Sequence, residues 1–199
     1  MKPKTIVTLI LIIQPYLHVV AQTISETFTD TRDGKTYRTV RIGKLTWMAE
    51  NLNFLMDNSV CYDNDAINCQ TYGRLYTWND AMNACPAGWH LPDTSAWSDL
   101  VKITGGIYAA SNTLKSKVGW QNSSNGTDEF GFSALPGGGR SDGGRFRHIG
   151  EHGNWWSASP DPSPGDNGAY SRNIFYDNDY VYESPNYKSI GFSVRCVRE

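Results

Sequence analysis

Four cysteines place the strongest constraint on how this chain can fold. They are Cys61, Cys69, Cys85 and Cys196. In an exported protein an even number of cysteines indicates disulfides, and four cysteines allow three pairings. We favour Cys61–Cys69, a local link, together with Cys85–Cys196, which ties the middle of the chain to its far end. The sequence contains no Cys-x-x-Cys motif, so the usual support for a zinc site or a thioredoxin-like site is missing.

The start of the chain reads as a signal peptide, residues 1–21. It opens with two lysines, continues as an apolar run to Ile13, and reaches the small residue Ala21 before Gln22. Pro15 interrupts the apolar run, whereas a membrane-spanning helix needs about 20 apolar residues. We therefore predict cleavage near Ala21–Gln22, a secreted or cell-surface location, and no membrane span once the signal is removed.

Length and charge limit the number of domains and the kind of partner. After a short N-terminal segment, residues 22–29, we expect a single domain over residues 30–199. The formal net charge is −2 for the whole chain, and loss of the two leader lysines makes it −4. Because no basic run is present, the sequence offers no source of affinity for phosphates, and we expect no nucleic-acid partner.

Two helices are predicted in the middle of the chain. The first has one apolar stripe at helical spacing, formed by Trp78, Ala81, Met82 and Cys85, and ends at Pro86. The second begins after Pro92, with Asp93 or Thr94 as N-cap, and ends at Gly105–Gly106. Its buried stripe consists of Trp97, Leu100 and Val101.

The remaining pattern predicts short strands. A turn at residues 32–35 precedes YRTVRI and LTWMAENL, and six further runs follow residue 120: FGFSAL, RFRHI, NWWSAS, AYSRNIFY, YVYES and IGFSVRCVR. The segment Gly137–Arg140, GGGR, could cradle an anion, but no helix follows it, and we interpret it as a turn. The fold class is therefore α+β, with two early helices packed on a twisted, mainly antiparallel sheet.

Seven motifs give the chain a family resemblance. They are, in order, TVRIGKLTWMAENLNF, CYDNDAINC, YGRLYTWNDAM, CPAGWHLPDTSAW, GFSALPGGGR, WWSAS and GFSVRCVR. Over residues 30–198 the chain resembles the Fibrobacter succinogenes major paralogous domain family. This resemblance implies an exported bacterial protein and supplies no established activity. More distantly the chain is similar to the C-type lectin fold, in which an early helix cysteine is bridged to the final strand, as Cys85 and Cys196 would be.

No catalytic motif is recognisable, and we expect a non-catalytic protein. Two segments also resemble formylglycine-generating enzymes, whose chemistry uses two cysteines near the C-terminus, but this chain has only Cys196 there. In HIGEH, His148 and His152 could share a metal on a helix, yet Gly150 and Gly153 indicate a turn, and we predict no metal site. The alternatives are an extracellular enzyme with a site around His90, His148 and His152, or a purely structural surface protein.

Binding of a glycan, or of another extracellular partner, is the function that the composition favours. Aromatic residues crowd the C-terminal half, and they stand beside acidic and amide residues: the candidate ligand-binding residues are Trp155, Trp156, Tyr170, Tyr176, Asp177 and Asp179. Tyr180 and Tyr182 belong to the same crowd. Because adjacent residues of a strand face opposite sides, we expect one of the two tryptophans to pack in the core and the other to face outward or under a loop.

Calcium is the one cofactor that the sequence leaves open. Asp63 and Asp65, in an acidic-amide cluster, are the candidate ligands, since calcium prefers several oxygen ligands on a turning loop. Asp and Asn are also ordinary turn residues, because their side chains bond to their own backbone. No complete calcium-loop motif is present.

Overall fold

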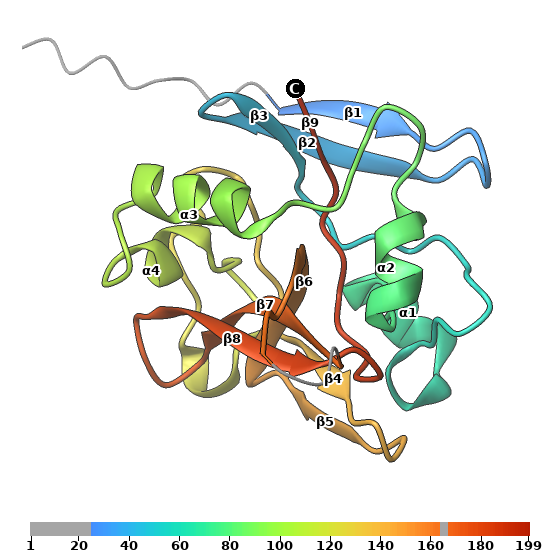
Figure 1. Ribbon diagram of the computed structural model, residues 1–199. Helices are drawn as coiled ribbons and strands as arrows, with labels where there is room; N and C mark the ends of the chain where they lie inside the picture. The colour runs from blue at the N-terminus through green and yellow to red at the C-terminus, as the bar shows by residue number, and fades with distance from the viewer. Residues whose placement is uncertain (1–24, 164–166) are drawn as a thin grey trace, which may run out of the picture.

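The computed structural model describes residues 25–163 and 167–199. The predicted signal peptide and the first residues of the predicted segment 22–29 lie outside this part of the chain. Within the described residues the α+β class is confirmed, but the sheet arrangement differs from the prediction. Instead of one sheet, the strands form a four-stranded, a two-stranded and a three-stranded sheet (Figure 1).

The N-terminal sheet has the strand order β1-β2-β3-β9 and is antiparallel throughout. Its strands are β1 (Ser25–Thr29), β2 (Thr36–Ile42), β3 (Leu45–Met48) and β9 (Val197–Arg198). The predicted turn at residues 32–35 is confirmed and joins β1 to β2. Gly34 adopts the positive φ of 74° that this turn requires. Trp47 pairs with Val197, so the last strand completes the first sheet.

Four short helices lie between the sheets in the described chain: α1 (Ala66–Tyr72), α2 (Trp78–Ala84), α3 (Thr94–Ile103) and α4 (Ala110–Leu114). Single-turn 3-10 helices, η1 (Tyr62–Asn64) and η2 (Gln121–Ser123), accompany them. Both predicted helices are confirmed as α2 and α3. Asp93 caps α3 by accepting a hydrogen bond from the Ala96 amide at 2.7 Å, because the first amides of a helix lack partners. Met82 of the predicted α2 stripe is exposed, which corrects that assignment.

The C-terminal half contains two antiparallel sheets. Strands β4 (Gly137–Arg140) and β5 (Phe146–Ile149) form a hairpin, and β6 (His152–Pro160), β7 (Gly168–Phe175) and β8 (Val181–Tyr187) form the three-stranded sheet. The prediction of a turn at Gly137–Arg140 is wrong, because these glycines form β4. A Cβ on Gly138 would lie 2.5 Å from the Arg147 carbonyl oxygen, so close strand pairing requires glycine here.

Both predicted disulfides are confirmed. Cys61 is bonded to Cys69, and Cys85, at the end of α2, is bonded to Cys196. In Figure 1 the segment that leads to β9 runs between the α1–α2 side and the α3–α4 side of the molecule. The long disulfide fastens this central segment to α2.

Two apolar clusters form the core. The first contains Trp97 and Leu100 of α3, with Trp47 and Trp155, and the second includes Tyr76, Trp156 and Val194.

Arg195 is fully buried and donates hydrogen bonds to the carbonyl oxygens of Met48, Phe132 and Ser133 and to Asn51. These bonds tie the last segment to loops from both the early and the middle part of the chain.

Among the described residues, no helix has the length and apolar character required to cross a membrane.

Candidate functional site

Trp155 and Trp156, both predicted as ligand-binding candidates, are core residues. They face opposite sides of β6, as the sequence predicts, but each side is covered by an apolar cluster, and their exposed fractions are 1% and 0%. Their indole nitrogens donate at 2.8 Å to the Asn51 side chain and to the Tyr76 carbonyl oxygen, respectively. Of the two alternatives for the second tryptophan, the outward one is wrong: the C-terminal segment that contains Phe192 and Val194, together with α2, covers Trp156.

The other predicted residues lie on the β7–β8 hairpin without forming one site. Tyr170 is half-buried on β7, and Tyr176 packs against the first apolar cluster. Asp177 and Asp179 are exposed in the connecting turn, which Asn178 stabilises by accepting a bond from the Tyr180 amide at 3.1 Å. Lys115 is buried beneath this turn; burial lowers its pKa, and the carboxylates of Asp179 and Asp177 oppose the shift.

A continuous row of aromatic rings crosses the surface next to this hairpin. We call it the aromatic strip; it consists of Tyr108, Tyr180, Tyr182, Phe175, His152 and His148. Successive ring centroids are 5.2, 5.7, 5.1, 4.4 and 4.1 Å apart, all at or near the usual range for interacting rings. The three tyrosines are 69%, 42% and 37% exposed, so their rings are presented to solvent.

A cavity of about 300 Å³, with apolar as well as polar lining residues, adjoins the strip. Three residues of the strip also line the cavity: His148, His152 and Phe175. The β4–β5 hairpin adds two cationic residues to the cavity lining, Arg140 and Arg147. This volume lies at the lower end of the range for small-ligand sites. The cavity therefore joins aromatic surface, cationic side chains and amide side chains in one place.

Three of the lining residues, Asn154, Asn173 and Asn186, form a hydrogen-bonded row with the buried Ser171. We call these four side chains the polar ladder. Asn173 donates to Asn154 at 2.8 Å, Ser171 donates to Asn173 at 3.2 Å, and Asn186 donates to Ser171 at 3.0 Å. The ladder spans all three strands of the sheet, since Asn154 lies on β6, Asn173 on β7 and Asn186 on β8. These mutual bonds fix the orientation of the amide groups, which gives a preorganised polar surface.

At the far end of the strip, the β5–β6 turn gathers His148, Glu151 and His152. The His148 Nδ1 lies 2.8 Å from a Glu151 carboxylate oxygen, and the two imidazole rings are stacked with an interplanar angle of 13°. Burial and the neighbouring His148 lower the pKa of His152, while Glu151 and Asp177 oppose this shift. The turn predicted from Gly150 and Gly153 is present between β5 and β6, and it brings the two imidazole rings together without the helix on which metal sharing was considered.

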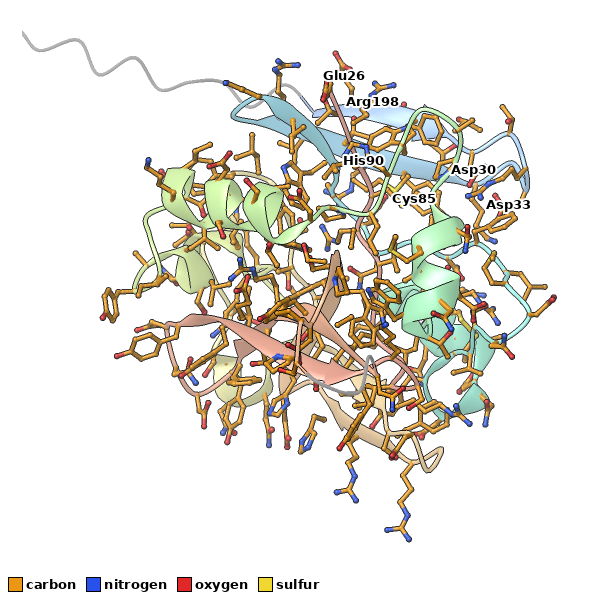
Figure 2. The ribbon with its side chains drawn as sticks, in the orientation of Figure 1. Glu26, Asp30, Asp33, Cys85, His90 and Arg198 are labelled. Carbon is orange, nitrogen blue, oxygen red and sulfur yellow. A yellow bond between two sulfur atoms is a disulfide. The ribbon has the colours of Figure 1, made fainter. Side chains whose placement is uncertain are left out.

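His90 does not join the other two histidines. It is exposed, and its backbone pairs with Val197 next to the N-terminal sheet. Figure 2 shows His90 close to Arg198 at that end of the molecule, whereas β5 lies at the opposite end in Figure 1. The three-histidine site of the enzyme alternative is therefore not assembled.

The calcium candidates occupy a helix start. The Asp65 carboxylate accepts a hydrogen bond from the Ile67 amide at 2.9 Å and caps α1, and Asp63 has a φ of 53° in η1. The sequence analysis allowed a turn role for these residues; the capping of α1 by Asp65 is seen only in the structure.

Tyr108 and Phe175 are the site residues that the sequence reasoning missed. Tyr108 follows the glycines that end α3 and reaches Tyr180 only through the folded structure, so no local pattern links them. Phe175 lies in a run that was read only as a strand. The surplus of aromatic residues in the C-terminal half was the one available signal.

Comparison with family models matches residues 40–198 to the Fibrobacter succinogenes major domain. Among curated proteins no match is found. Solved structures give no match either, so the distant likeness to the C-type lectin fold stays a prediction.

Proposed function

The chain belongs to the Fibrobacter succinogenes major domain family, and from this premise and the site geometry we propose that it is a non-catalytic glycan-binding module of the cell exterior. Its two disulfides fit an oxidising, extracytoplasmic location. We propose secretion or display at the cell surface on the same grounds, together with the signal-peptide pattern of residues 1–21.

The aromatic strip is the observation that carries this proposal. Exposed tyrosine rings in a row offer flat apolar faces, against which the C–H faces of successive sugar rings can pack, while each phenol hydroxyl remains free to hydrogen-bond. A strip of six connected rings is longer than one sugar, which favours an extended polysaccharide over a monosaccharide.

The polar ladder supplies the second requirement. Sugar hydroxyls need fixed donors and acceptors, and small-ligand sites commonly combine an apolar wall with a few oriented polar groups. Asn186 lines the cavity together with Ser184 and Arg140. An end or branch of the glycan would therefore enter the cavity while the main chain follows the tyrosines.

Retention on immobilised polysaccharides and a glycan array test this proposal. We expect Tyr180→Ala and Tyr182→Ala each to weaken retention about tenfold, equivalent to about 1.4 kcal/mol of binding free energy. Both residues are exposed, Tyr182 on the edge strand β8 and Tyr180 in the turn before it, so their removal should leave the thermal midpoint close to that of the unmodified protein.

Tyr187→Ala is the matched control. Tyr187 is also on β8 and is 64% exposed, but it lies off the strip, beside a wider groove of about 960 Å³. We expect this variant to bind as the unmodified protein does. Failure to bind any glycan of a broad array, or weakening by Tyr187→Ala without weakening by the strip variants, would refute the assignment.

A further inference from the structure

The cluster at the β5–β6 turn has the composition of a transition-metal site. In the described part of the chain, His148, Glu151 and His152 form the one group of three such side chains whose candidate ligand atoms all lie within 4.8 Å of one another. Two imidazoles and one carboxylate are ligands that zinc and neighbouring divalent ions favour. The glycan proposal uses the two imidazole rings only as members of the aromatic strip and assigns no role to Glu151.

The turn that carries the cluster is held in place from several sides. Its backbone is closed by a bond from the Glu151 amide to the His148 carbonyl oxygen at 3.1 Å. The Gly150 amide donates to Pro136 at 2.9 Å, and the Glu151 carbonyl oxygen accepts from the Tyr176 amide at 2.8 Å. The backbone positions of the three residues are therefore fixed before any ion binds, which lowers the ordering cost of binding.

The side chains need only a small movement to share an ion. A zinc ion with ligand bonds of about 2.1 Å holds tetrahedral ligand atoms roughly 3.4 Å apart, which is about 1.4 Å below the upper limit of 4.8 Å seen here. His148 is exposed, and the terminal torsions of histidine and glutamate have broad minima. The His148 Nδ1 already lies 2.8 Å from a Glu151 carboxylate oxygen. A small rotation of the His148 ring out of the stack would let an ion enter between these two atoms and a nitrogen of His152.

His152 has the support expected of a ligand. Its ring packs against Phe175 at 4.4 Å between centroids, which restricts the orientations that it can adopt. The cavity described above opens beside it, so one side of the cluster is accessible to solvent. Three protein ligands leave a fourth position for water, the arrangement found where zinc is not purely structural.

We propose that His148, Glu151 and His152 form a surface site for a divalent transition-metal ion of the zinc type. The site shares His148 and His152 with the aromatic strip, but its argument rests on their ligand atoms and on Glu151, and its test uses the protein without a sugar. The hairpin, rather than a helix, supplies the geometry.

Isothermal titration with ZnCl2 tests the proposal, using oxidised protein purified without a polyhistidine tag. We expect one saturable site per chain, and a weakening of at least tenfold in His148→Ala and in Glu151→Gln, which removes the charge but keeps the shape. Cobalt(II) should give visible absorption bands upon binding, and these bands should be lost in the same variants. CaCl2 should give no comparable binding, since imidazole is a poor ligand for calcium.

Two further variants separate ligation from folding. His152→Phe keeps an aromatic ring against Phe175 and removes the ligand, so it should fold normally and lose binding. His90→Ala removes the distant histidine and should bind zinc as the unmodified protein does. The proposal would be overturned if the unmodified protein showed no saturable zinc binding, or if His148→Ala and His152→Phe bound zinc as tightly as the unmodified protein. It would also be overturned if His90→Ala lost as much affinity as the ligand variants.

Discussion

The two disulfides should contribute unequally to stability, and the difference follows from the loops that they close. Cys85–Cys196 spans 111 positions and Cys61–Cys69 spans 8. In the chain-entropy relation these loops correspond to about 4.8 and about 2.6 kcal/mol of unfolding free energy. At roughly 2–4 °C per kcal/mol for a domain of this size, removal of the long bridge should lower the thermal midpoint by about 10–19 °C, against about 5–10 °C for the short one.

The matched pair of variants is Cys85→Ala/Cys196→Ala and Cys61→Ala/Cys69→Ala. Each removes two sulfur atoms, and each includes one well-buried partner, Cys196 or Cys69, so the packing losses should be comparable. Calorimetry and urea unfolding followed by far-UV circular dichroism would give the two midpoints and free energies. If the Cys61→Ala/Cys69→Ala variant lost as much unfolding free energy as the other variant, or more, loop length would not determine which disulfide stabilises the protein more.

Three other outcomes test particular contacts of the fold. In urea unfolding, Gly138→Ala should lower the free energy of unfolding more than Gly88→Ala does. Both glycines have a positive φ, but only at Gly138 would the new Cβ meet the backbone, at 2.5 Å from the Arg147 carbonyl oxygen. Asp93→Ala should cost about 1 kcal/mol of unfolding free energy by removing the α3 cap, and an unchanged midpoint would contradict that role. Burial raises the pKa of Tyr37 from 10.0 to about 12. Because Tyr37 then ionises at lower pH in the unfolded chain than in the folded protein, the free energy of unfolding should fall as pH rises from 10 to 12. Urea unfolding across this pH range should show a smaller fall in Tyr37→Phe.

Features set by neighbouring residues were predictable from the sequence. The cap and buried stripe of α3, the stop of α2 before Pro86 and the β1–β2 turn depend on contacts within a few residues, and all are confirmed. The disulfide pairing was also predictable, because Cys61 and Cys69 are close in sequence and leave Cys85 for Cys196.

Features set by distant contacts were not predictable. The run at 130–135 has the alternating pattern of a strand, but none of the strands β1–β9 includes it. Phe132 packs instead against the buried Arg195, whose guanidinium carbon lies 4.5 Å from the centroid of the Phe132 ring. The glycines of β4 have low strand propensity and form a strand because the surrounding chain leaves no room for side chains.

The candidate site illustrates the same limit. Aromatic and Asp-rich composition pointed to the β7–β8 hairpin, where part of the proposed strip lies, but did not separate its exposed residues, such as Asp177 and Tyr180, from the buried Trp155 and Trp156. Whether Trp156 is covered depends on the segment that contains Val194, which returns from the far end of the chain to close the second core cluster. The contact of Tyr108 with Tyr180 likewise joins two parts of the chain that no local pattern relates.

The pairing of β3 with β9 has a consequence for the order of events during synthesis. Val197 is synthesised long after its partner Trp47, near the end of the domain, and the buried Arg195 arrives with it. The N-terminal sheet therefore stays incomplete until translation of the domain is almost finished, and such long-range pairing is intrinsically slow. The β1–β2 and β2–β3 pairs can form early, but the edge of β3 stays open until β9 arrives.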